Sequence, residues 1–179
     1  AINPYKIITE NPANSVTQTK DKTIRRIKAL TEKESRQLLD ALSDNPTFYM
    51  IAFIALNTGM RYGEIAGLTW NSINFPRQTI AIDKQYNWIS SQKRGFKAVK
   101  SRNGNRTIHM NTKLAARLNA WKQTVPLSID GRVIPTTPST HSLMNRQLRK
   151  LKQGISIHTL RHTFATMLLS KSKDINLVA

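Results

Sequence analysis

The segment from Asn45 to Glu64, which reads NPTFYMIAFIALNTGMRYGE, decides the fold of this chain. Asn45 followed by a proline is a strong start signal for a helix. Residues 48–56 are apolar on almost every side, which is typical of a helix at the centre of a core. Gly59 is expected to end this helix. A second, short helix is then expected to begin near Arg61.

The segments on either side of this central helix keep a mainly helical pattern. Thr31, followed three residues later by Glu34, forms a capping box that opens an earlier helix. Strands are predicted at 79–82 and 86–89, and residues 96–100 are predicted to pair with 106–110 as a hairpin around an Asn-Gly turn. Further helices are expected from Asn111 or Thr112, from Ser139 and from His158. We therefore predict an α+β, mainly helical fold: a helix bundle with a small antiparallel sheet.

Positive charge is concentrated in the second half of the chain. The 179 residues carry a formal net charge of +18. Residues 1–83 hold 10 basic and 8 acidic side chains, whereas residues 84–179 hold 18 basic and 2 acidic ones. So long a block of one sign repels itself, and we expect a polyanion to neutralise it, with nucleic acid as the leading class of partner.

Several classes of protein are excluded by composition. The chain has no cysteine, so disulfides, thiol nucleophiles and cysteine-based zinc sites are ruled out. The longest apolar run, 48–56, is too short to cross a bilayer, which takes about 20 residues. The first residues do not resemble a signal peptide. We therefore expect a soluble, cytoplasmic or nucleoid-associated protein that does not bind a membrane.

Two segments carry side chains suited to holding a phosphate. Arg61 lies at the predicted N-terminus of the short helix, where backbone N–H groups and a guanidinium converge. Glu64 can hold Arg61 by an ion pair, although an ordinary surface pair has the same spacing. Helical spacing also places His158, Arg161 and His162 on one face, where arginine can clamp an oxyanion and histidine can move a proton. A chance cluster of basic residues is the alternative for this second group.

A third segment, the predicted hairpin, is rich in basic residues. On chemical grounds Lys100 is either a catalytic ammonium or one of many lysines that contact phosphates. The basic residues around it are expected to bind DNA; they are Lys93, Arg94, Lys97, Arg102 and Arg106.

Taken in order, these segments resemble one family. The pattern Thr58-Gly-x-Arg-x-x-Glu, then Lys100, then His158-x-x-Arg-His resembles the catalytic domain of tyrosine recombinases, the phage-integrase family, over residues 29–179. The resemblance implies the fold of the DNA breaking–rejoining enzymes. It also implies a site-specific recombinase or integrase that cleaves and rejoins double-stranded DNA through a phosphotyrosyl intermediate and integrates a phage or other mobile element.

The resemblance also implies a role for each matched residue. Arg61 and Arg161 bind the scissile phosphate, Lys100 protonates the leaving 5′-oxygen, and His158 is the general acid/base. Glu64 and His162 support them. No cofactor is implied, and no metal is expected, because the ten carboxylates are scattered without a pair to hold Mg²⁺.

The chain departs from the family at the nucleophile. The family's tyrosine, and a third His/Trp position before it, follow the second arginine and have no match here; Tyr5, Tyr49, Tyr62 and Tyr86 all precede it. A side chain adjacent to Arg61 on a helix points about 100° away from it, which argues against Tyr62. We therefore expect a catalytic domain that is incomplete at its C-terminus and inactive alone, preceded by a linker at 1–28 from a missing core-binding domain.

A second hypothesis is a DNA-binding module without chemistry, such as a decayed integrase or a regulator, and a basic RNA-binding protein is a third. The first two both predict binding that weakens steeply with salt. By the family resemblance we expect the intact protein to self-associate as a tetramer on DNA, and this chain to be a monomer.

Overall fold

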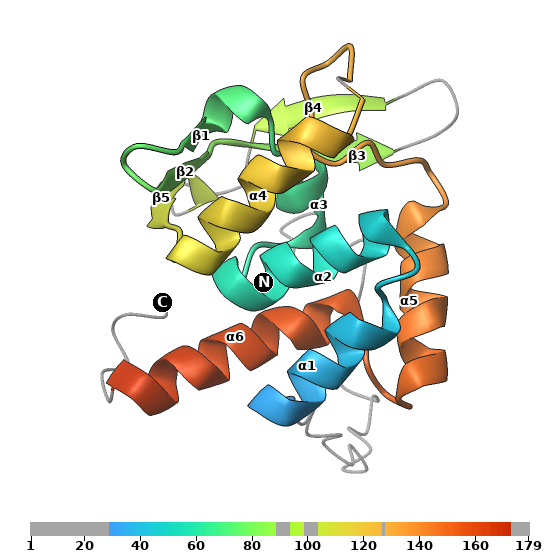
Figure 1. Cartoon of the computed structure of the whole chain (residues 1–179). Helices are drawn as coiled ribbons and strands as arrows, with labels where there is room; N and C mark the ends of the chain where they lie inside the picture. The colour runs from blue at the N-terminus through green and yellow to red at the C-terminus, as the bar shows by residue number, and fades with distance from the viewer. Residues whose placement is uncertain (1–28, 89–93, 99–103, 127, 173–179) are drawn as a thin grey trace, which may run out of the picture.

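The computed structural model of the chain describes residues 29–88, 94–98, 104–126 and 128–172 (Figure 1). The linker predicted at 1–28 and the segment that carries Lys100 lie outside these residues. The helices are α1 (Glu32–Ala41), α2 (Pro46–Thr58), α3 (Tyr62–Ala66), α4 (Thr112–Thr124), α5 (Thr140–Leu151) and α6 (Ile157–Ser172), with a 3₁₀ turn at Trp70–Ser72. The strands are β1 (Ile73–Asn74), β2 (Thr79–Ile82), β3 (Lys84–Trp88), β4 (Arg94–Ala98) and β5 (Arg106–His109).

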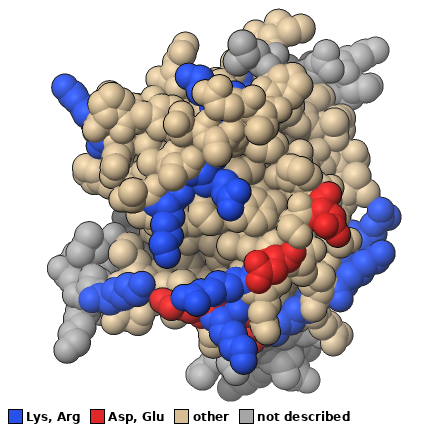
Figure 2. All heavy atoms as spheres, in the orientation of Figure 1, with Lys and Arg blue, Asp and Glu red and all other residues tan. Residues whose placement is uncertain are grey.

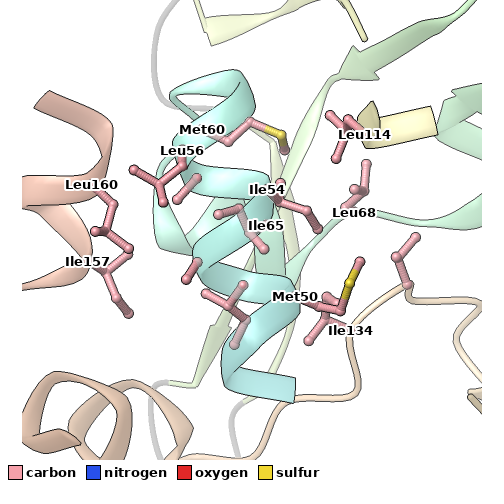
Figure 3. Close-up of a cluster of buried hydrophobic side chains, with 14 of the residues drawn as sticks. Met50, Ile54, Leu56, Met60, Ile65, Leu68, Leu114, Ile134, Ile157 and Leu160 are labelled. Atoms are coloured by element: carbon pink, nitrogen blue, oxygen red, sulfur yellow. The ribbon is translucent and has the colours of Figure 1, made fainter. Parts of the chain in front are cut away.

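Helix α2 lies at the centre of the core, as its composition predicted. The Asn45 side chain accepts a hydrogen bond from the Phe48 N–H at 3.0 Å, and a proline occupies the first turn. Gly59 ends the helix with a φ of 64°, in the left-handed region that suits glycine. Figure 3 shows how the other elements surround α2; the labelled side chains that pack around it include Ile65, Leu68, Leu114, Ile134, Ile157 and Leu160, all buried.

Helix α1 begins at the predicted capping box. Thr31 accepts a hydrogen bond from the Glu34 N–H, and the Glu34 carboxylate accepts one from the Thr31 N–H at 2.8 Å. The residue just before the helix is tied to the far end of the chain, because the Leu30 N–H donates to the Thr163 hydroxyl at 3.0 Å. An ion pair between Glu34 and Lys152 also joins α1 to the end of α5. These contacts hold α1 against the C-terminal helices (Figure 1).

The strands form two small antiparallel sheets among the described residues, and the predicted hairpin between 96–100 and 106–110 is wrong. Strand β4 pairs with β3, with Phe96 opposite Tyr86, whereas β5 pairs with β2, with Ile108 opposite Ile80. Strand β4 begins at Arg94, two residues before the strand predicted from Phe96.

The physical reason for this pairing lies in the side chains. Ile80 is completely buried, and Ile108, opposite it, packs against the same core. Tyr86 and Phe96 instead meet edge to face, with ring centroids 5.3 Å apart. Each strand therefore pairs where its own apolar face finds a partner.

The remaining helices close the domain around α2. Asn111 caps α4 by accepting a hydrogen bond from the Leu114 N–H at 2.8 Å. In α5 the buried residues include Met144 and Leu148, whereas Leu143 and Leu151 are both more than a third exposed. Over the part of the chain that the structure describes, no helix combines the length and apolar character needed to span a bilayer.

Candidate active site: a cationic cluster around Glu64

Gly59 brings the end of α2 against α6. A Cβ atom built at this position would lie 2.5 Å from Cδ1 of Phe164, so only glycine allows the two helices to come so close. The carbonyl oxygen of Gly59 also accepts a hydrogen bond from Nη1 of Arg161. Two segments about 100 residues apart therefore meet immediately before Arg61.

Arg61 is anchored by both its backbone and its side chain. It occupies the N-cap position of α3, and the carboxylate of Glu64 accepts hydrogen bonds from its backbone N–H at 2.9 Å and from its Nη1 at 3.1 Å. The ion pair expected from their spacing is present. Glu64 is only 3% exposed, whereas the Arg61 side chain is 60% exposed. The guanidinium is thus held at one edge and open to a ligand at the other.

A second arginine reaches the same carboxylate from strand β5. The guanidinium of Arg106 donates to both oxygens of Glu64, at 3.2 and 2.9 Å, and to the carbonyl of Gly104 at 3.2 Å. Burial by itself raises the pKa of Glu64, but the hydrogen bonds from Arg106 and from the Arg61 backbone outweigh it and hold the pKa below its ordinary value. Glu64 is therefore an ionised, buried carboxylate shared by two arginines.

Helix α6 contributes the third part of the site at its first turns. Ser156 and Thr159 exchange capping hydrogen bonds there, and the Ile157 N–H donates to the Asn145 side chain at 3.0 Å. These contacts fix where the helix starts. His158 and His162 follow on one face, with ring centroids 4.4 Å apart at nearly a right angle.

The charges of these residues act on one another. Burial lowers the pKa of His158, and so do the nearby His162, Arg161 and Arg61; the imidazole is therefore mainly neutral at pH 7. Burial and the positive charge of Arg61 likewise lower the pKa of Arg161, against the opposite effect of Glu64. A guanidinium nevertheless stays protonated at neutral pH.

We call Arg61, Glu64, Arg106, His158 and Arg161 the Glu64 cluster. It contains three of the four residues predicted to be catalytic, together with Glu64, which was predicted to support them. The fourth, Lys100, lies outside the described residues. Such a cluster can bind an oxyanion through two guanidiniums and exchange a proton through a neutral imidazole.

Among the described residues, those predicted to bind DNA do not lie on one common surface. Lys93 and Arg102 lie outside the described residues, and Arg94 is placed only as the first residue of β4. Lys97 is exposed on β4. Arg106 faces inward toward Glu64 and its side chain is only 27% exposed, so it does not share the exposed position of Lys97.

Sequence reasoning missed this inward position of Arg106, although a signal existed. Along β5 the residues alternate, and Arg106 shares its face with Ile108, while Thr107 lies on the exposed face. Because alternate residues of a strand share a face, a core-facing Ile108 implies a core-facing Arg106. An arginine that is partly buried on a core-facing side of a strand is stabilised by an acidic partner, which Glu64 supplies.

Tyr62 lies next to Arg61 in the chain but not in the cluster. Its ring contacts the imidazole of His141 in α5, with centroids 4.6 Å apart. Burial raises its pKa to about 12, which makes its hydroxyl harder to ionise. Both observations agree with the argument from helix geometry against Tyr62 as a nucleophile.

The electrostatic surface is not uniformly basic. On the face drawn in Figure 2, Asp and Glu side chains lie among Lys and Arg side chains. Among the described residues, no group of three or more His, Asp or Glu side chains is arranged to hold a metal ion. The Glu64 cluster itself contains a single carboxylate, already occupied by two arginines.

The sequence of the chain matches a known family. The profile of the Phage integrase family matches residues 28–179, and the chain therefore belongs to the phage integrase family. It is also similar to the ICEBs1 integrase of Bacillus subtilis (strain 168), with 24% identity over 191 residues, which cover 94% of this chain and 50% of that protein. The chain thus spans about half the length of this relative.

Solved structures show the same fold. The Tn1549 transposon integrase in complex with transposon right end DNA has a TM-score of 0.77 at 21% identity, covering 96% of this chain and 62% of that one. The catalytic domain of the bacteriophage HP1 integrase has a TM-score of 0.54 at 20% identity, covering 83% and 76%. The predicted class, a mainly helical α+β fold of the tyrosine recombinase type, is confirmed.

Proposed function

We propose that this chain is the catalytic part of a site-specific DNA recombinase, or integrase, that cleaves and rejoins double-stranded DNA through a phosphotyrosyl intermediate. The observation that carries the proposal is that Arg161 donates a hydrogen bond to the Gly59 carbonyl, two residues before Arg61, and that the charges of both arginines act on His158. Membership of the phage integrase family supports it. So does the net charge of +18, because DNA is a polyanion.

In this mechanism the two guanidiniums bind the scissile phosphate. Arg61 is held by Glu64 and Arg161 by the Gly59 carbonyl, so neither has to be ordered when the phosphate arrives. Each guanidinium can donate two parallel hydrogen bonds to the non-bridging oxygens, where negative charge increases in the transition state. Fixed cations of this kind do most of the work in phosphoryl transfer.

Proton movement completes the step. A tyrosine hydroxyl attacks the phosphorus and loses its proton, while the 5′-oxygen leaves and takes one up. His158 is mainly neutral at pH 7 and is suited to accepting the first proton, because one nitrogen of a neutral imidazole is unprotonated. By its family resemblance, Lys100 is the proposed donor of the second.

The ring of each tyrosine in the described residues packs against a side chain that is not part of the Glu64 cluster. Tyr49 stacks on Phe53, Tyr62 lies against His141, and the ring of Tyr86 faces the guanidinium of Arg132. We therefore propose that the attacking tyrosine is none of these three, and that this chain by itself binds DNA without cleaving it.

The partner and assembly belong to the same proposal. The Tn1549 integrase was solved in complex with transposon DNA, and by analogy the proposed substrate here is double-stranded DNA at the ends of a mobile element. We propose a tetramer on DNA for the intact protein and a monomer for this chain. The proposed location is the cytoplasm, on the nucleoid, where that DNA lies.

The test is to trap a covalent complex. The full-length gene product would be incubated with nicked suicide substrates made from the DNA that flanks its gene, and protein bound to a 3′-phosphate would be identified by mass spectrometry. The control Arg36→Gln removes one positive charge from an exposed helical pair and should leave trapping unchanged. Salt-sensitive binding without any covalent complex would instead support the non-catalytic DNA-binding module.

A further inference from the structure

The side chain of Arg106 donates more hydrogen bonds to Glu64 than the side chain of Arg61 does. Its Nη1 and Nη2 reach both carboxylate oxygens, whereas the Arg61 side chain reaches only one of them. Its own side chain is 27% exposed against 60% for Arg61. Arg106 is therefore the less accessible of the two arginines, and more of its side-chain donors are used in hydrogen bonds within the protein.

The charge balance explains why two arginines are needed. A carboxylate that is 3% exposed is stable only if cations and hydrogen-bond donors compensate for its lost hydration. If Arg61 were the only cation on Glu64, its charge would be neutralised by that carboxylate. Because Arg106 supplies a positive charge, the trio Arg61–Glu64–Arg106 keeps a net charge of +1 beside Arg161.

Arg106 also reaches the backbone next to its own strand. It donates to the carbonyl of Gly104, a buried residue, at 3.2 Å. A single guanidinium thereby links the N-terminus of α3 to the chain that enters β5. Lysine at this position would keep the charge but not the fork that makes several hydrogen bonds at once.

We propose that Arg106 is a positioning residue that acts through Glu64: it compensates the buried carboxylate, so that Glu64 orients Arg61 toward the phosphate without neutralising it. The inference deepens the recombinase proposed above and rests on it. It replaces the expectation that Arg106 binds the DNA backbone directly.

The first experiment compares single and double substitutions in the full-length protein. We expect Arg106→Gln to slow single-turnover cleavage about 100-fold, as a displaced catalytic group does. Arg106→Lys should retain part of the rate. Glu64→Gln should also be slow, and the double variant should be no slower than the slower single variant, because both changes remove one coupled unit. If the double variant loses as much cleavage rate as the product of the losses in the two single variants, the proposal is overturned.

DNA affinity separates positioning from direct contact. The slope of binding against salt should be unchanged in Arg106→Gln, as in the control Arg36→Gln, which removes the same charge from an exposed position. A slope reduced by about 1 in Arg106→Gln alone would mean that Arg106 neutralises a phosphate, and would overturn the proposal.

A third measurement does not depend on cleavage. Carbon-13 NMR titration of the 179-residue chain should show the pKa of Glu64 rising in Arg106→Gln, with an unchanged melting temperature in Arg106→Lys as the check on folding. An unmoved Glu64 pKa would overturn the coupling. If the unsubstituted protein forms no covalent complex while Glu64 still responds to Arg106, the recombinase proposal fails and the coupling stands.

Discussion

Two regions of this chain, the Glu64 cluster and strand β4, hold their positive charges in different ways. In the Glu64 cluster each guanidinium has a defined acceptor, either the Glu64 carboxylate or the Gly59 carbonyl. On strand β4, Lys97 is exposed and makes no recorded ion pair within the described part of the chain. Fixed cations can stabilise a particular transition state, whereas free ones attract any polyanion.

The difference between these two regions also shows where the chain places its few acidic side chains. Only 10 carboxylates face 28 basic residues, so most cations have none to pair with. One of those few is buried at the site, where it serves two arginines. We conclude that orientation, rather than amount of charge, distinguishes the proposed active site from the rest of the basic surface.

The strongest test of this comparison is Arg161→Gln in the full-length protein. We expect cleavage to fall about 1,000-fold, because one fixed donor to the developing charge is lost, with little change in DNA affinity. Rates of covalent-complex formation under single-turnover conditions measure it. Arg161→Lys, which keeps the charge but loses the fork, should lie between; cleavage by Arg161→Gln at the unsubstituted rate would contradict the role.

A second test removes the close approach on which the cluster depends. Gly59→Ala should lower the free energy of unfolding by about 2–3 kcal/mol, since it adds a left-handed backbone cost to a clash with Phe164. The matched control is Gly131→Ala, which has a φ of 68° but no atom within 4 Å of the added Cβ, and should cost only about 1 kcal/mol. Urea unfolding measures both. Equal losses in the free energy of unfolding of the two variants would show that the close contact of Gly59 with α6 does not contribute to stability.

A third test addresses the free charges. Lys97→Gln should weaken DNA binding and reduce the slope of affinity against salt by about 1, because one phosphate contact is lost. Fluorescence anisotropy at several salt concentrations measures the slope. Arg36→Gln, equal in charge, should leave it unchanged; the same reduction in both variants would mean that position on the surface does not matter.

The smallest effect is expected from a change in the pKa of His158. His162→Asn removes one of the positive groups that lower the pKa of His158, so that pKa should rise toward its ordinary value. A larger fraction of His158 is then protonated at pH 6, and the acid limit of cleavage should move to higher pH. NMR titration of the His158 ring measures it. A His158 pKa that stays fixed or falls in this variant would contradict the effect of His162 on His158.

Local signals in the sequence predicted much of this structure. The Thr31 capping box, the Pro46 start of α2 and its end at Gly59 all occur where expected, because each depends on residues within one or two turns. The same holds for the Arg61–Glu64 ion pair, three residues apart. The shared face of His158 and His162 follows from helical spacing alone.

What the sequence left open depends on contacts between distant residues. An alternating strand can pair with any neighbour that covers its apolar face, so only the assembled core decided that β4 joins β3 and that β5 joins β2. The same assembly turned Arg106 onto Glu64, 42 residues away, and brought Arg161 to the Gly59 carbonyl, 102 residues away. The sequence by itself determined the helices and the chemical groups. The tertiary structure decided which of these groups meet, because burial and charge compensation are satisfied only when all the elements are in place.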